Sequence, residues 1–121
     1  MAVYMDEVWK TISGYEEYEI STLGRVKSHK KHRGTYERYL KPRVVKDGYL
    51  MVALYRNNKC TNKQVHRLVA EAFLEKPLNT TEINHIDGNK TNNCVNNLEW
   101  ITHLDNVKHY VNVLKARKTN V

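Results

Sequence analysis

Three side chains in the last third of the sequence have the chemistry needed to hydrolyse a phosphodiester. Asn84 and His85 are adjacent, and Asn106 follows later in the chain. Amide oxygens are hard ligands that suit a divalent cation, and an imidazole that titrates near neutral pH can take a proton from water. A metal ion on the phosphate and a base for the water are sufficient for this hydrolysis. We therefore take Asn84 and Asn106 as candidate metal ligands and His85 as the candidate general base.

These residues can meet only if the elements around them fold into a compact unit. Residues 82–85 (EINH) and 98–102 (LEWIT) are predicted to form short strands. Thr102 and Asp105 have the spacing of a capping box, which predicts a helix over residues 103–116. A ββα unit of this kind can bring the end of its first strand beside the first turn of its helix.

The loop between the two predicted strands is rich in asparagine. Six of the seventeen residues from Asn84 to Trp100 are asparagine. A loop leaves backbone polar groups without ladder partners, and asparagine side chains can pair with those groups locally. We therefore expect most of these residues to shape the loop and do no chemistry, namely Asn89, Asn92, Asn93 and Asn96.

The upstream sequence predicts mainly strands and turns. Residues 16–28 should be extended, Asp47-Gly48 is a strong hairpin signal, and Asn57-Asn58 indicates another turn. Residues 65–76 have apolar residues at helical spacing, and Pro77 should close that helix. The sequence thus predicts an α+β fold. A small β-rich part over residues 1–60 precedes a unit over residues 61–121, whose ββα core spans residues 82–116.

Charge is unevenly distributed along the 121 residues, whose formal net charge is +7. Residues 21–70 contain thirteen Lys or Arg and two acidic residues, whereas residues 1–20 and 71–107 are each net acidic. A basic segment of this density favours a polyanion such as double-stranded DNA as the partner. The candidates for phosphate contacts are Arg25, Lys27, Arg38, Lys41, Arg43 and Arg67.

Other features exclude several classes of protein. No apolar run approaches membrane-spanning length, and the N-terminus lacks a signal-peptide profile. We therefore expect an intracellular, soluble protein. The two cysteines, Cys60 and Cys94, form no Cys-x-x-Cys pair, so neither a disulfide framework nor a cysteine-based zinc site is indicated.

Several segments together resemble the HNH endonuclease family, specifically its phage and intron-encoded homing type. These segments are VHRLVAEAF (65–73), NHIDGNKTNN (84–93), NLEWIT (97–102) and Asn106, in the order and at the spacing of that family. Residues 9–28 are also similar to a small DNA-contacting module that often precedes such nuclease domains. Because the segments occur together, the resemblance is more specific than any one of them.

The resemblance implies a role for each matching residue. His85 would be the general base, and Asn84 and Asn106 would bind a single divalent metal, Mg²⁺ or Mn²⁺. Asn97 would be the middle asparagine of the motif, which ties down the loop and helps to orient the base, and His109 is a candidate for a further ligand. The substrate would be double-stranded DNA, cut in one or both strands to 5′-phosphate and 3′-hydroxyl ends. A phage-encoded member would act in the cytoplasm of its bacterial host.

Two other functions stay open at this stage. Asn84 occupies a position where some relatives have aspartate, and a neutral amide binds Mg²⁺ less tightly than a carboxylate. The protein could therefore bind DNA with a weak or inactive nuclease centre. A third hypothesis is an interaction protein whose basic face binds an acidic protein. The sequence leaves monomer and dimer equally open.

Overall fold

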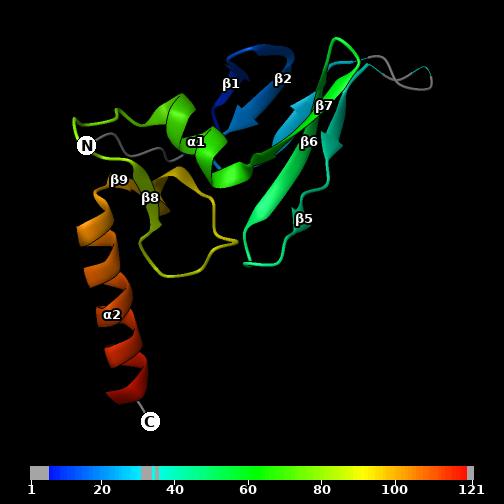
Figure 1. Ribbon diagram of the computed structural model, residues 1–121. Helices are drawn as coiled ribbons and strands as arrows, with labels where there is room; N and C mark the ends of the chain where they lie inside the picture. The colour runs from blue at the N-terminus through cyan, green and yellow to red at the C-terminus, as the bar shows by residue number, and fades with distance from the viewer. Residues whose placement is uncertain (1–5, 31–33, 35, 120–121) are drawn as a thin grey trace.

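The computed structural model describes residues 6–30, 34 and 36–119 and has an α+β fold (Figure 1). Within these residues the strands form three antiparallel sheets. The first sheet contains β1 (Trp9–Ile12), β2 (Tyr15–Ser21), β3 (Val26–Ser28) and β4 (Arg38–Leu40), in that order. The second contains β5 (Arg43–Val44), β6 (Leu50–Arg56) and β7 (Lys59–Gln64), and the third contains β8 (Glu82–His85) and β9 (Leu98–Ile101). The helices are α1 (Val65–Phe73), the single 3-10 turn η1 (Val95–Asn97) and α2 (His103–Thr119).

The turns predicted in the N-terminal part are confirmed. The hairpin between β5 and β6 turns at Gly48, where φ is +89° and a side chain would be strained. The β6–β7 hairpin turns at Asn57 and Asn58, whose φ values are +52° and +62°. Asparagine tolerates this left-handed region better than most residues, which explains its use there.

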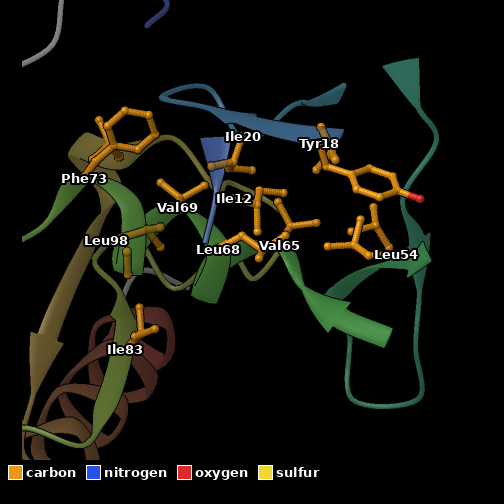
Figure 2. Close-up of a cluster of buried hydrophobic side chains, with 14 residues drawn as sticks. Ile12, Tyr18, Ile20, Leu54, Val65, Leu68, Val69, Phe73, Ile83 and Leu98 are labelled. Carbon is orange, nitrogen blue, oxygen red and sulfur yellow. The ribbon is translucent and has the colours of Figure 1, made fainter. Parts of the chain in front are cut away.

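One core joins the elements around α1 (Figure 2). Tyr18 and Ile20, two residues apart on β2, are both buried, because alternate residues of a strand point to the same face. They pack in the same cluster as Val69 of α1 and Leu98 of β9. Residues from both ends of the chain therefore build one apolar interior, which fixes the ββα unit against the first sheet.

The division of the chain at residue 60 stays a prediction, and the structure places that boundary inside β7. β7 runs from Lys59 to Gln64 and pairs with β6 along its whole length. It leads directly into α1, so the strand joins the two predicted parts.

In the described residues, no helix is long and apolar enough to cross a membrane.

The predicted extent of the first helix is wrong by three residues. The α1 helix ends at Phe73, and Leu74 is extended, with φ −110° and ψ 134°. Its amide still donates to the carbonyl of Ala70, which completes the last turn. Lys76 precedes Pro77, and a residue before proline disfavours the helical conformation, so the chain leaves the helix early.

The second helix starts where the sequence predicts and continues further. The hydroxyl oxygen of Thr102 accepts a hydrogen bond from the Asp105 amide at 3.2 Å, which caps the helix. Neither glycine nor proline follows residue 116, and the helix runs on to Thr119. The first turns of α2 pack beside β8, and the rest of the helix extends away from the protein body (Figure 1). β9 ends at Ile101, one residue before the predicted end.

Candidate active site

The ββα unit encloses one pocket, about 650 Å³ in volume, between β8, the loop after it and α2. Asn84, His85 and Asn106 all line this pocket. The first two are neighbours at the end of β8, where the chain turns because the Gly88 amide donates to the His85 carbonyl. The three residues chosen from the sequence are therefore brought together around one space.

Two carboxylates orient the two amides of the pocket. Nδ2 of Asn84 donates to Glu99 at 2.9 Å, and Nδ2 of Asn106 donates to Glu82 at 2.8 Å. Because an ionised carboxylate only accepts hydrogen bonds, each amide must turn its nitrogen toward it. Hydrogen bonds from Asn106 and then His103 hold the pKa of Glu82 below its usual value, so Glu82 is ionised at neutral pH.

This arrangement fits a divalent cation. The Nδ2 atoms of Asn84 and Asn106 are engaged, so the Oδ1 oxygens are the ends of these amides left to bind an ion. Such oxygens are suitable ligands for Mg²⁺ or Mn²⁺. Among the residues that the structure describes, no cluster of three or more His, Cys, Asp or Glu side chains could hold a metal. The candidate ligands in this pocket are the amide oxygens of Asn84 and Asn106, with His109 as a possible further ligand.

The sequence alone did not identify Glu99 and Glu82, the two carboxylates that orient the amides. Glu99 is the cross-strand partner of Asn84 in the β8–β9 register, and Glu82 lies two residues before Asn84 on the same strand. The register of the hairpin is the signal that could have identified Glu99. Glu82 could not have been found in the same way, because its partner comes from α2.

His85 is buried, and among the described residues its side chain hydrogen-bonds to Asn93. Its Nε2 lies 2.8 Å from Oδ1 of Asn93. Burial lowers the pKa of His85, and the hydrogen bond to Asn93 opposes this shift without cancelling it. The imidazole is therefore neutral at physiological pH, which is the protonation state that a general base requires.

Two aromatic residues of other elements pack against the His85 ring. The ring centroid of His66, from α1, lies 5.0 Å away in an edge-on arrangement, and that of Tyr49 lies 5.9 Å away. His66 is only 7% exposed, and its Nδ1 has no partner among the described groups. Burial, followed by the nearby His85, lowers the pKa of His66 to about 4. His66 thus places a neutral ring beside the candidate base.

The low pKa of His66 predicts that the protein loses stability in mild acid. The unfolded chain binds a proton near pH 6.5 and the folded state only near pH 4, so the free energy of unfolding should fall across this range. At about 1.4 kcal/mol per pKa unit, His66 accounts for about 3 kcal/mol by pH 4. Urea unfolding of the wild type and of His66→Phe, measured between about pH 7 and pH 4, tests this. The free energy of unfolding of His66→Phe should fall less steeply with decreasing pH than that of the wild type. His103→Phe, at an exposed position, should fall as steeply as the wild type. Equal slopes for the wild type and His66→Phe would contradict the prediction.

The side chain of Asn97 forms three hydrogen bonds within the loop. Its Nδ2 donates to Oδ1 of Asp87 and to the Asn92 carbonyl, both at 2.9 Å, and its Oδ1 accepts from the Asp87 amide at 3.0 Å. The residue that hydrogen-bonds to His85 is Asn93, which the sequence placed among the loop-shaping asparagines. The role of Asn97 in orienting the base stays a prediction: its carbonyl accepts from the amide of Ile86, the residue after His85, at 2.8 Å.

The other two histidines of the pocket are engaged with the protein. His109 Nε2 lies 3.0 Å from the Ile86 carbonyl and links α2 to the residue after β8. Only its Nδ1 is left for a cation, and its role as a ligand stays a prediction. His103 pairs with Glu82 at 2.5 Å and lies at the mouth of the pocket with its side chain 74% exposed.

The structure separates the candidate phosphate-binding residues into a first group that has acidic partners, namely Arg25, Lys27 and Arg67, and a second group that has none within the described ranges. Arg25 donates to both carboxylate oxygens of Glu7, and the Lys27 side chain is 15% exposed beside Glu37. Among the described residues, no carboxylate lies within ion-pair distance of the second group, which is exposed and consists of Arg38, Lys41 and Arg43. Arg67 is exposed on α1, 3.9 Å from Glu71. The second group has the cations best placed to meet a polyanion.

Comparison with known proteins agrees with this fold and site. Residues 63–108 match the model of a family described as HNH endonuclease, and residues 7–55 match the NUMOD4 motif. The chain belongs to the HNH endonuclease family, with a NUMOD4 motif before the nuclease region.

The relatives include a phage enzyme of known structure. The chain is 40% identical over 116 residues to the DNA endonuclease I-HmuI of Bacillus phage SP01, covering 91% of this chain and 64% of the relative. A structure described as DNA binding and cleavage by I-HmuI matches with a TM-score of 0.75 and 36% identity, over 93% of this chain and 65% of that one. An HNH endonuclease of Acanthamoeba polyphaga mimivirus is 43% identical over 78% of this chain and 27% of the relative. The chain thus spans less than two thirds of the length of each.

Proposed function

We propose that this protein is a metal-dependent DNA endonuclease of the homing type. It would hydrolyse a phosphodiester of double-stranded DNA to leave a 5′-phosphate and a 3′-hydroxyl. The observation that carries the proposal is the convergence of His85 with two carboxylate-oriented amides on one pocket. The phage and viral relatives support this activity and an intracellular place of action.

The residues of the pocket would divide the reaction between them. His85 would take a proton from the attacking water, and burial favours the neutral imidazole that this step needs. Asn84 and Asn106 would hold a divalent ion, Mg²⁺ or Mn²⁺, through their Oδ1 oxygens. When bound, such an ion supplies Lewis-acid stabilisation of the charge that develops on the phosphate and the leaving oxygen. Asn97 would keep the loop in shape.

The N-terminal part would hold the DNA. The NUMOD4 match covers β1 to β5 and most of β6. The exposed cations Arg38, Lys41 and Arg43 are the first candidates for phosphate contacts, because no ion pair among the described residues competes for them. Arg25, Lys27 and Arg67 are weaker candidates, because each has an acidic partner.

Conversion of supercoiled plasmid tests the activity. Incubation with Mg²⁺ or Mn²⁺ should produce open-circular or linear DNA, and EDTA should prevent it because the metal is removed. Which product appears first separates nicking from double-strand cutting. If the protein binds duplex DNA yet converts none with either metal, it is a DNA-binding protein and the proposed activity is wrong.

The DNA-binding alternative has one observation in its favour. The first ligand position carries the neutral Asn84, which holds a cation less tightly than a carboxylate would. A salt titration of duplex binding separates both nucleic-acid functions from binding to an acidic protein. Affinity for DNA should fall steeply as salt rises, because phosphate contacts release counterions.

A further inference from the structure

Asn93 is the side chain that hydrogen-bonds to the candidate base. It is 4% exposed, and its Oδ1 lies 2.8 Å from Nε2 of His85. An amide oxygen can only accept, so this bond requires the proton of a neutral imidazole to be on Nε2. The lone pair is then on Nδ1, and a base needs that lone pair to receive a proton.

The other end of the Asn93 amide argues against a purely structural role. Its Nδ2 is buried and has no hydrogen-bond partner among the described groups. An unpaired buried donor destabilises the folded state, and an apolar side chain of similar shape would avoid that cost. Such an unpaired buried donor calls for an explanation, and a role of the Asn93 oxygen beside the candidate base supplies one.

The turn between β2 and β3 packs against Asn93. Gly24 lies in this turn with φ +82°, and a Cβ atom there would come within 2.9 Å of the Asn93 Cβ and 3.1 Å of its carbonyl oxygen. Two residues beyond Asn93, the Val95 amide donates to the Thr22 carbonyl at 2.8 Å. The turn thus contacts the loop at Asn93 and is hydrogen-bonded to it just beyond.

We propose that Asn93 is a positioning residue that fixes the tautomer of His85, and that the β2–β3 turn of the first sheet holds Asn93 in place. The first sheet, which lies within the residues that match the NUMOD4 motif, is then also part of the active-site framework. This inference rests on the proposed function only in so far as His85 acts as a base.

Two substitutions of Asn93 separate its accepting oxygen from its bulk. Asn93→Asp keeps an acceptor for Nε2–H, and Asn93→Leu removes it without leaving a large cavity. In Asn93→Leu the catalytic rate should fall at least about 100-fold, as expected when the partner of a functional histidine is lost or its tautomer is wrong. Asn93→Asp should stay within about tenfold of the wild type. The leucine variant should unfold at equal or higher urea concentration, because the unpaired Nδ2 is gone.

Nitrogen-15 NMR of His85 gives a measurement that does not depend on cleavage. In the wild type at mildly alkaline pH, Nε2 should show the shift of a protonated ring nitrogen and Nδ1 that of an unprotonated one. Asn93→Leu should show a mixture of tautomers, and Asn93→Asp should keep the wild-type pattern. If Asn93→Leu keeps the pure Nε2–H tautomer, or the wild type lacks it, the proposal is wrong. The NMR result stands even if the protein cuts no DNA, so failure of the proposed function is recognised separately.

Asn92→Leu is the matched control within the same loop. Asn92 bonds to Asp87 at 2.9 Å and is not a partner of His85. Its loss should change the rate by less than about threefold, since only a solvent-exposed bond is removed. Equal losses in Asn92→Leu and Asn93→Leu would mean that the loop has merely loosened, and would overturn the assignment.

A glycine pair tests the support from the β2–β3 turn. Gly24→Ala places a methyl group against Asn93, whereas Gly14→Ala has nearly the same backbone strain, φ +81°, and its nearest neighbour is an Arg56 atom at 3.5 Å. Gly24→Ala should disturb the His85 tautomer and lower the rate, and Gly14→Ala should do neither. Indistinguishable effects of the two variants on the His85 signals would refute a supporting role for the turn.

Discussion

Replacing His85 with alanine should abolish plasmid cleavage and leave the affinity for duplex DNA nearly unchanged. His85 is the buried, neutral imidazole at the end of β8, and the alanine variant has no imidazole at that position to accept a proton from water. Loss of a positioned general base costs about 10²–10⁴-fold, and we expect a fall of at least about 1,000-fold. DNA affinity should hold because the exposed cations of the N-terminal part are unaffected.

Single-turnover cleavage and fluorescence anisotropy of duplex binding, measured side by side, check this result. His103→Ala is the matched control, because it removes another histidine of the same pocket, one whose Nδ1 bonds to Glu82. That variant should lose no more than about tenfold, as for a partner outside the reacting groups. Cleavage by His85→Ala within tenfold of the wild type would remove His85 from the mechanism.

Asn106→Ala should shift the metal requirement of cleavage by more than about 100-fold, because even residues outside the ligand shell account for 10–100-fold in metal affinity. Alanine is the best helix former, so α2 should be intact and the loss should lie in binding the ion. The Glu82 carboxylate keeps its hydrogen bond to His103 in this variant. Because the defect lies in binding the ion, the rate should recover in part as the Mg²⁺ concentration is raised.

The measurement is the metal concentration at half-maximal rate, with His103→Ala beside it. His103→Ala removes the other hydrogen-bond partner of Glu82 and leaves both amide oxygens in place. It should need nearly the same metal concentration as the wild type. If Asn106→Ala has an unchanged metal requirement, Asn106 is not a ligand, whatever happens to the maximal rate.

The parts of this fold that the sequence predicts well are those that depend on local chemistry. The turns at Gly48 and at Asn57 depend on backbone conformations that few residues adopt. The capping oxygen of Thr102 marks the start of α2 for a similarly local reason. The end of α1 was predicted less well. The helical spacing of the apolar residues does not reveal that Leu74 packs against the core or that the nearby Pro77 ends the helix early.

The sequence by itself determined the residue types of the site: one histidine and two amides in a ββα unit of a recognisable family. Only the tertiary structure decided which side chains orient them. Glu82 meets Asn106, and His66 meets His85, through contacts between elements that no local pattern encodes. Asn93 and Asn97 are both asparagines of one loop, and composition cannot tell which of them faces the base. That choice is made by the packing of the β2–β3 turn against Asn93, a contact between residues distant in the chain.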